Sequence, residues 1–219
     1  MDIALDIETM RNSAWIDKMP EVEVKLGNLK DAAKIQEKME AAKKAQLEDM
    51  ALSPFYGRVC AFVAIKEDDV ENAIKKCITA ETDAEETSLI EFLFKTISEQ
   101  RVITYNGTNF DLPFIYQRAI MLGIDPREFN MPTLAEMTAR YNNKHHVDVM
   151  TVWTGGGPKF EKLDNLGAAI LGERKKDIDF REFPELIKTE TGRTDLLNYC
   201  EQDVALTLRL WSRFSGILV

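Results

Sequence analysis

The feature that most constrains this chain lies at its N-terminus, where a run of apolar residues leads into two carboxylates. Residues 1–5 are typical of a short buried strand, and Asp6-Ile7-Glu8-Thr9 follows at once. Side chains alternate along a strand, so Asp6 and Glu8 are expected on the same face of a sheet. Two carboxylates this close cannot both stay charged in a confined site without a compensating cation. The fold must therefore place this strand end either at a solvated edge or at a cation site.

Composition narrows the class of protein. The 219 residues suffice for one well-packed domain, and 45% hydrophobic with 30% charged residues is ordinary for a globular chain. No apolar run approaches the ~18 residues of a membrane span, and no basic segment precedes the first apolar stretch. The cysteines Cys60, Cys77 and Cys200 form no C-x-x-C pair, which predicts reduced thiols and a cytoplasmic location. The net charge of −9 argues against indiscriminate nucleic-acid binding, although bound divalent cations can invert the local field.

The hydrophobic pattern predicts three strands followed by alternating helices and strands. Three sequential strands favour antiparallel pairing, whereas the later alternation favours parallel crossovers. After the first strand, strands are expected at 59–65, 73–80, 102–105 and 147–150, and helices at 83–97, from about 112, at 163–171 and at 194–214.

Two more acidic motifs occur downstream, Asn106 to Asp111 and Tyr199 to Asp203. Asp111 falls at a strand-to-helix junction, where an aspartate is more often an N-cap. The i, i+4 spacing puts Tyr199 and Asp203 on one helical face, as many amphipathic helices also do.

Gathered carboxylates suit hard divalent cations, and two such ions can stabilise both oxygens of a phosphodiester displacement. A tyrosine with a pKa of ~10 is a poor base at neutral pH, so Tyr199 is predicted to orient the attacking water.

Taken together, the three motifs resemble the exonuclease motifs of the DEDD, or DnaQ-like, superfamily. The spacing of Tyr199 and Asp203 resembles its tyrosine branch (DEDDy). The form N-x-x-x-F-D resembles the proofreading domains of family B DNA polymerases and similar stand-alone bacterial and phage exonucleases. This resemblance implies an α/β, RNase H-like fold: a mixed β-sheet flanked by helices, with a helical insert after the first strand. It implies one exonuclease domain over residues 1–219, with the insert at about 10–53.

The resemblance also implies an activity, 3′→5′ exonuclease hydrolysis with two divalent metal ions, Mg²⁺ or Mn²⁺. The expected partner is the 3′ end of a single strand, preferably DNA, with replication or repair proteins as further partners and no membrane. The implied metal ligands are Asp6, Glu8, Asp111 and Asp203, the implied water-orienting residue is Tyr199, and the implied contacts to the terminal nucleotide are Thr9, Asn106 and Phe110.

Two alternatives stay open. RNase D-type enzymes share the tyrosine motif, so an RNA 3′-end trimming nuclease is the second hypothesis. A non-catalytic module that binds nucleic acid or a replication partner is the third, although four intact carboxylates argue against it.

The insert also has two interpretations. Residues 30–50 combine an apolar stripe with five lysines on one predicted helix. Mixed charge favours a surface helix packed on the core. The sharper hypothesis places the helix beside the active site, with its lysines holding the single strand; these are Lys30, Lys34, Lys38, Lys43 and Lys44.

Other polar groups receive plainer interpretations. His145 and His146 are expected to flank a strand rather than to bind metal, and Asp148 to cap or turn the chain. The basic run Arg174-Lys175-Lys176 is interpreted as a solvated surface turn.

Overall fold

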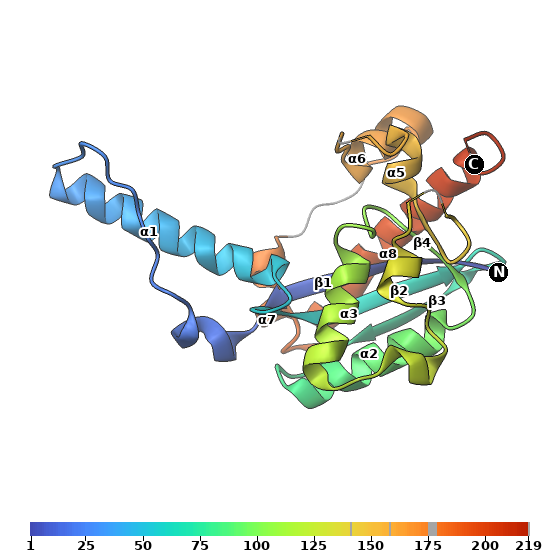
Figure 1. Ribbon diagram of the computed structural model, residues 1–219, viewed down its shortest axis with the longest axis horizontal. Coiled ribbons are helices and arrows are strands. Elements are labelled where there is room, and N and C mark those ends of the chain that lie inside the picture. The colour runs from blue at the N-terminus through green and yellow to red at the C-terminus, as the bar shows by residue number, and fades with distance from the viewer. Residues whose placement is uncertain (141, 158, 175–178, 219) are drawn as a thin grey trace.

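A five-stranded mixed sheet forms the centre of the protein, with the strand order β3-β2-β1-β4-β5. The computed structural model describes residues 1–140, 142–157, 159–174 and 179–218, so Lys175 and Lys176 of the basic run lie outside the described residues. β1 pairs antiparallel with β2, and β2 with β3, whereas β1–β4 and β4–β5 are parallel. Helices α2 and α3 cover one face of the sheet and α8 covers the other (Figure 1). The structure thus confirms the expected mixed sheet flanked by helices.

The element bounds follow the predicted order closely. The strands are β1 (Asp2–Arg11), β2 (Gly57–Lys66), β3 (Asp69–Cys77), β4 (Arg101–Thr104) and β5 (His146–Asp148). The α-helices are α1 (Ala32–Asp49), α2 (Asp83–Ile97), α3 (Asp111–Leu122), α4 (Leu134–Met137), α5 (Val149–Thr154), α6 (Leu163–Leu166), α7 (Phe183–Leu186) and α8 (Glu190–Phe214). Shorter turns of 3-10 helix occupy Ser13–Lys18, Met50–Leu52, Pro126–Phe129 and Phe180–Glu182, and Gly167–Leu171 is a π-helix.

Three of these elements correct the sequence-based expectation. The strand expected at 73–80 is β3, which begins earlier, at Asp69, and ends at Cys77. The strand expected at 147–150 ends at Asp148, because the Asp148 carboxylate accepts from the amides of Met150 and Thr151 and so starts α5. The helix expected at 163–171 is α6 followed by the π-helix, which ends at Gly172 in the left-handed conformation (φ 72°). Gly172 therefore closes this segment as predicted.

Alternation along β1 separates two cores. Ile3, Leu5 and Ile7 belong to the core that α2 and α3 cover, whereas Ala4 belongs to the core beneath α8. By the same alternation, Asp6 and Glu8 continue the row of Ala4 on the α8 side of the sheet. Both cores are closed by fully buried aliphatic and aromatic side chains, so β1 is held from both sides.

β1 continues well beyond the end of its parallel neighbour β4. Their pairing runs from Asp2–Arg101 to Ala4–Ile103, and β4 ends at Thr104. Arg101 donates its amide to the Met1 carbonyl, while the Asp2 carbonyl accepts from Glu67 beyond β2. Odd-numbered residues of β1 therefore direct their backbone groups toward β4. Past Thr104 that edge of β1 has no strand partner among the described residues, and Asp6 and Glu8 lie on this stretch.

A buried ion pair fixes α3 against α2 and β2. Glu86 on α2 is fully buried and accepts from Nε and Nη2 of Arg118 on α3, at 2.8 and 2.6 Å. The same carboxylate accepts from the Val59 amide of β2 at 2.9 Å. Charge-assisted, bidentate bonds of this kind are geometrically specific. The network therefore fixes the position of α3, the helix that carries Asp111 as its first residue.

The insert after β1 forms an arm, which we define as residues 13–52. Its main helix, α1, has no buried residue and projects from the sheet, with the segment before it running back alongside (Figure 1). Lys38 and Gln46 on α1 donate to the carbonyls of Lys25 and Pro20 in that segment. This differs from the expectation of a helix packed on the core, because charged side chains on all sides leave α1 without a wide apolar stripe.

The root of the arm, in contrast, is part of the core. Met50 and Ala51 are buried, and the Thr9 hydroxyl donates to the Ala51 carbonyl at 2.7 Å. None of the described helices combines the length with the hydropathy that a bilayer crossing requires.

We predict that the root and the shaft of the arm respond differently to truncation. Met50 is 1% exposed, so Met50→Ala should lower the free energy of unfolding by about 2–4 kcal/mol through an unfilled cavity. Met39 on α1 is 47% exposed, and Met39→Ala should change it by less than about 0.5 kcal/mol. Urea denaturation measures both. A similar loss in the two variants would show that α1 is packed on the body.

Candidate active site

The segment Asp6-Ile7-Glu8-Thr9, which we call motif one, places its two carboxylates together on β1, where they meet α8. One oxygen each from Asp6 and Glu8 and the Sγ atom of Cys200 all lie within 4.8 Å of one another. The Cys200 thiol is 3.5 Å from Oδ2 of Asp6 and 3.6 Å from its carbonyl oxygen. Cys200 is buried, whereas Asp6 and Glu8 are partly exposed. The carboxylates therefore sit where α8 packs on the face of β1, past the end of the β4 pairing.

Asp111 reaches this edge from the other helical layer. It is the first residue of α3, is 3% exposed, and does not cap its own helix, whose N-cap is Phe110. Instead, its Oδ1 atom accepts from the Ile7 amide at 3.3 Å. Ile7 lies between Asp6 and Glu8 and past the end of β4, so the carboxylate takes the place of a strand partner. The capping interpretation of Asp111 is therefore wrong.

Asp203 and Tyr199 approach on α8. Asp203 is 8% exposed, and Tyr199, one helical turn earlier, is partly exposed. Cys200 and Asp203 belong to the buried side of the helix, which packs on β1 and β2. The charges of Asp111, Glu8 and Asp203 all act on the Asp6 carboxylate. Three segments far apart in the sequence thus bring their acidic residues to one place.

The electrostatics of this cluster favour a bound cation. Burial raises the pKa of Asp6 well above its ordinary value, and the charges of Asp111, Glu8 and Asp203 raise it further. Burial raises the pKa of Asp111 to about 7, although the hydrogen bond from the Ile7 amide acts to lower it. Like charges that share a buried site repel unless a proton or a cation neutralises them. The donors are hard oxygens, so the cluster fits divalent ions such as Mg²⁺ or Mn²⁺.

The residues expected near a terminal nucleotide occupy three different settings. Thr9 is buried, and its hydroxyl already bonds the root of the arm. Phe110 is partly buried against Phe114, with ring centroids 5.6 Å apart. Asn106 is partly exposed, and its Oδ1 atom accepts from Nδ2 of Asn109 at 3.0 Å. Contact of these residues with a nucleotide stays a prediction.

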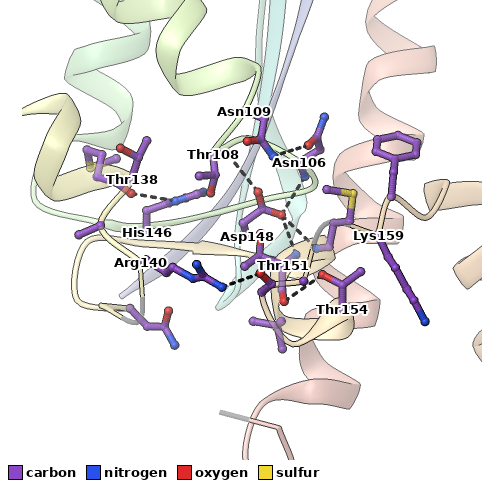
Figure 2. A pocket seen from close by; sticks show the side chains of 18 residues that line it. Asn106, Thr108, Asn109, Thr138, Arg140, His146, Asp148, Thr151, Thr154 and Lys159 are labelled. Carbon is purple, nitrogen blue, oxygen red and sulfur yellow. Dashed lines mark hydrogen bonds between the residues drawn. The ribbon is translucent and has the colours of Figure 1, made fainter.

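A cavity of about 690 Å³ opens beside the motif-two loop, which we define as residues 105–110. Asn106, Thr108 and Asn109 line one wall, and Arg140 and Lys159 are part of the lining (Figure 2). Arg140 donates to the carbonyl of Gly156 at 2.9 Å. The sequence pattern singled out neither cation, because each stands alone in a polar loop. Their place beside the motif-two loop comes from the fold.

Asp148 and His146 have larger roles than the sequence suggested. Asp148 does cap α5, as expected, but its carboxylate also accepts from the amides of Asn106 and Thr108 (Figure 2). His146 is buried, with Nε2 2.7 Å from the Thr104 hydroxyl and Nδ1 3.0 Å from the Met137 carbonyl. The sequence did contain a signal, the spacing His-x-Asp at a strand-to-helix junction. It did not indicate which residues His146 and Asp148 would bond.

Comparison with known proteins places the chain in a family. Residues 52–218 match the family described as predicted 3′-5′ exonucleases related to the exonuclease domain of PolB. The chain belongs to this family. The match starts after α1, so motif one and most of the arm lie outside it. The expected relation to family B exonuclease domains is thereby confirmed.

Curated relatives of this PolB-related chain include DNA polymerases. DNA polymerase 1 of Saccharolobus solfataricus is 26% identical over 226 residues, which cover 94% of this chain and 25% of the polymerase. DNA polymerase 1 of Aeropyrum pernix is 30% identical over 146 residues, which cover 63% of this chain and 14% of the polymerase. The chain therefore spans a quarter or less of the length of these relatives.

A solved structure shares the fold. The family B DNA polymerase from the hyperthermophilic archaeon Pyrobaculum calidifontis aligns with a TM-score of 0.64 and 16% identity. The alignment covers 97% of this chain and 24% of the polymerase chain. It confirms the RNase H-like fold expected of a PolB-related exonuclease domain.

The buried His146 should make the stability of this PolB-related chain pH-dependent. Burial lowers the pKa of His146 to about 4, below its ordinary value of 6.5, so the folded state keeps the ring neutral. Its contribution to stability is fully present above pH 6.5 and is lost as the pH falls toward 4. We expect the loss to reach up to about 3 kcal/mol, because one pKa unit corresponds to about 1.4 kcal/mol.

Urea denaturation between pH 4 and pH 7 measures this loss. His146→Gln should flatten the acid decline relative to the wild type, whereas His145→Gln should keep it. Asp6 and Asp111, whose pKa values are raised, give the opposite slope in every variant, so the difference isolates His146. Equal declines for His146→Gln and wild type would contradict the prediction.

Proposed function

We propose that this chain is a metal-dependent 3′→5′ exonuclease of the tyrosine branch that hydrolyses the 3′ end of single-stranded DNA. The observation that carries the proposal is the convergence of Asp6, Asp111 and Asp203, from β1, α3 and α8, on one partly buried cluster. The family match supports the class of reaction. Curated relatives include DNA polymerases, which favours DNA as substrate and replication or repair as the setting.

The proposed metal ligands are Asp6, Glu8, Asp111 and Asp203. Two divalent ions, when bound, supply charge stabilisation for the attacking and leaving oxygens of the phosphodiester. The chain itself holds the four carboxylates in register: β1 fixes the first two, the Ile7 amide fixes Asp111, and the core beneath α8 fixes Asp203. This preorganisation is achieved at the expense of like-charge repulsion, which a bound cation relieves.

Tyr199 is proposed to orient the attacking water through its hydroxyl. It lies one turn before Asp203 on α8, so both side chains share a helical face. A phenol of ordinary pKa near 10 keeps its proton at neutral pH and acts by hydrogen bonding rather than as a base. Tyr199 thus has a positioning function, and the carboxylates have a metal-binding function.

The cavity beside the motif-two loop is the proposed entry for the strand. Its lining includes the cations of Arg140 and Lys159 and the amide side chains of Asn106 and Asn109. Cations there can meet phosphates locally, even though the chain as a whole carries a net charge of −9. In this proposal residues 1–219 act as one exonuclease domain, with the arm as an addition outside the family match.

Removing one ligand charge should separate activity from stability. We expect Asp6→Asn or Asp203→Asn to cut exonuclease activity at least about 100-fold. Saturating Mn²⁺ should stabilise the wild type, by about 2.7 kcal/mol at 100 times Kd, and should stabilise these variants much less. Without metal, Asp6→Asn should melt at or above the wild-type temperature, because it relieves the repulsion around Asp6.

Thermal melting with and without Mn²⁺, together with a gel assay of a 5′-labelled oligonucleotide, tests this prediction. The matched control is Tyr199→Phe, which should keep the full Mn²⁺ stabilisation and lose rate. Identical melting curves with and without saturating Mn²⁺ in the wild type would show that the cluster binds no metal.

Polarity and substrate are tested with matched oligonucleotides. A 5′-labelled DNA strand with a free 3′ hydroxyl should give a product ladder, a 3′ phosphate should slow it, and a 5′ block should not. The Asp203→Asn protein controls for contaminating nuclease. Faster loss of the RNA version would favour an RNase D-like trimming enzyme instead. Cleavage of circular single strands at a comparable rate would show an endonuclease, and binding without cleavage would favour a non-catalytic module.

A further inference from the structure

Three successive amides of the motif-two loop are bound by two buried side chains. The Asn106 amide donates to Oδ1 of Asp148 at 2.9 Å, and the Thr108 amide donates to Oδ2 at 3.0 Å (Figure 2). Between them, the Gly107 amide donates to the Thr104 hydroxyl at 3.1 Å. Asp148 and Thr104 are 5% and 0% exposed, so these bonds are shielded from water. The loop backbone is therefore bound along its inner side.

The loop conformation makes specific demands at two residues. Asn106 has a φ of 64°, in the left-handed region, which asparagine adopts more readily than most residues other than glycine but still at some cost. A Cβ atom at Gly107 would lie 2.1 Å from the Thr104 hydroxyl, so only glycine allows this approach. Hydrogen bonds to a carboxylate are stronger than neutral ones and can offset such backbone strain. The partners of these amides thus select the conformation.

The Thr104 hydroxyl is itself fixed. Because it accepts from the Gly107 amide, its proton is free to point toward Nε2 of His146, 2.7 Å away. The other ring nitrogen, Nδ1, then donates to the carbonyl of Met137 at 3.0 Å. One neutral ring thus completes a buried chain of bonds from Gly107 to α4.

Resting on the proposed function, we propose that Asp148 is a positioning residue that holds the motif-two loop in the conformation that faces Asn106, Thr108 and Asn109 into the cavity. The hydrogen bonds of Asp148 go to backbone amides, so it acts through the loop backbone, and its negative charge also acts on the Asp111 carboxylate. Its Oδ1 atom bonds Asn106, Met150 and Thr151, whereas Oδ2 bonds Thr108. A substitution can therefore remove the bond to Thr108 while keeping the bonds made by Oδ1.

Asp148→Asn should keep the N-cap of α5 and disrupt the binding of the motif-two loop. Asparagine can keep Oδ1 as an acceptor for α5 and Asn106, because Asn and Asp are equivalent N-caps. Its NH₂ group would then oppose the Thr108 amide, so two donors face each other where a hydrogen bond stood. The matched control is Asp31→Asn at the N-cap of α1, where the carboxylate bonds the amides of Ala33 and Lys34.

Amide hydrogen exchange followed by NMR tests the binding of the loop without requiring activity. In the wild type, the amides of residues 106–108 should be protected. In Asp148→Asn, exchange at Thr108 should rise about tenfold or more, while Met150 and Thr151 change little. Asp31→Asn should leave all of these amides unchanged. Unprotected wild-type amides would overturn the proposal even if the variant does not fold, and unchanged exchange at Thr108 in the folded variant would overturn it as well.

Steady-state kinetics on a single-stranded DNA then tests the functional part. We expect Asp148→Asn to raise KM about 5- to 20-fold and to change kcat less than about threefold, with full Mn²⁺ stabilisation, because Asp111 is held separately by Ile7. Faster exchange with an unchanged KM would reduce Asp148 to a structural residue and overturn the proposal. If the wild type degrades no oligonucleotide, the proposed function fails, and the exchange data alone decide whether Asp148 holds the loop.

Discussion

The free edge of β1 is the feature on which the rest of the site depends. β4 ends at Thr104, while β1 continues for several residues past it. A backbone donor left without a strand partner must find another acceptor or water. At Ile7 that acceptor is the carboxylate of Asp111. One shortened strand therefore explains both why the edge is open and why the acidic residue of α3 turns toward motif one.

The crowding of carboxylates at this edge destabilises the metal-free protein. Asp6 and Asp111 have raised pKa values because burial and neighbouring carboxylates disfavour their charged forms. Stable folds seldom gather like charges in this way unless the site has a task. Structural stability must then come from elsewhere, namely from the two apolar cores. The buried Glu86–Arg118 pair fixes the position of α3, the helix that carries the proposed ligand Asp111.

The motif-two loop connects the two sides of this arrangement. Its first half is bound by Asp148 and Thr104 at the ends of β5 and β4, and its last residue leads into α3. The side chains of Asn106, Thr108 and Asn109 line the cavity on this loop. A loop held at successive amides can present side chains with little conformational freedom, which is what recognition of a strand end requires. The arm, by contrast, joins the body at its buried root and projects from it.

Local structure could be predicted from the sequence, because side-chain periodicity and motif spacing act over a few residues. The two-residue period of β1 correctly placed Asp6 and Glu8 together, and the order of strands and helices followed from apolar periodicity. The motif spacing correctly indicated a PolB-related exonuclease fold. What only the tertiary structure decided involves partners 40 to 200 residues apart: Asp111 with Ile7, Asp148 with Asn106, and Cys200 with Asp6. A carboxylate at a helix start looks like a cap in the sequence, and whether it bonds its own helix or a distant amide depends on where a neighbouring strand ends.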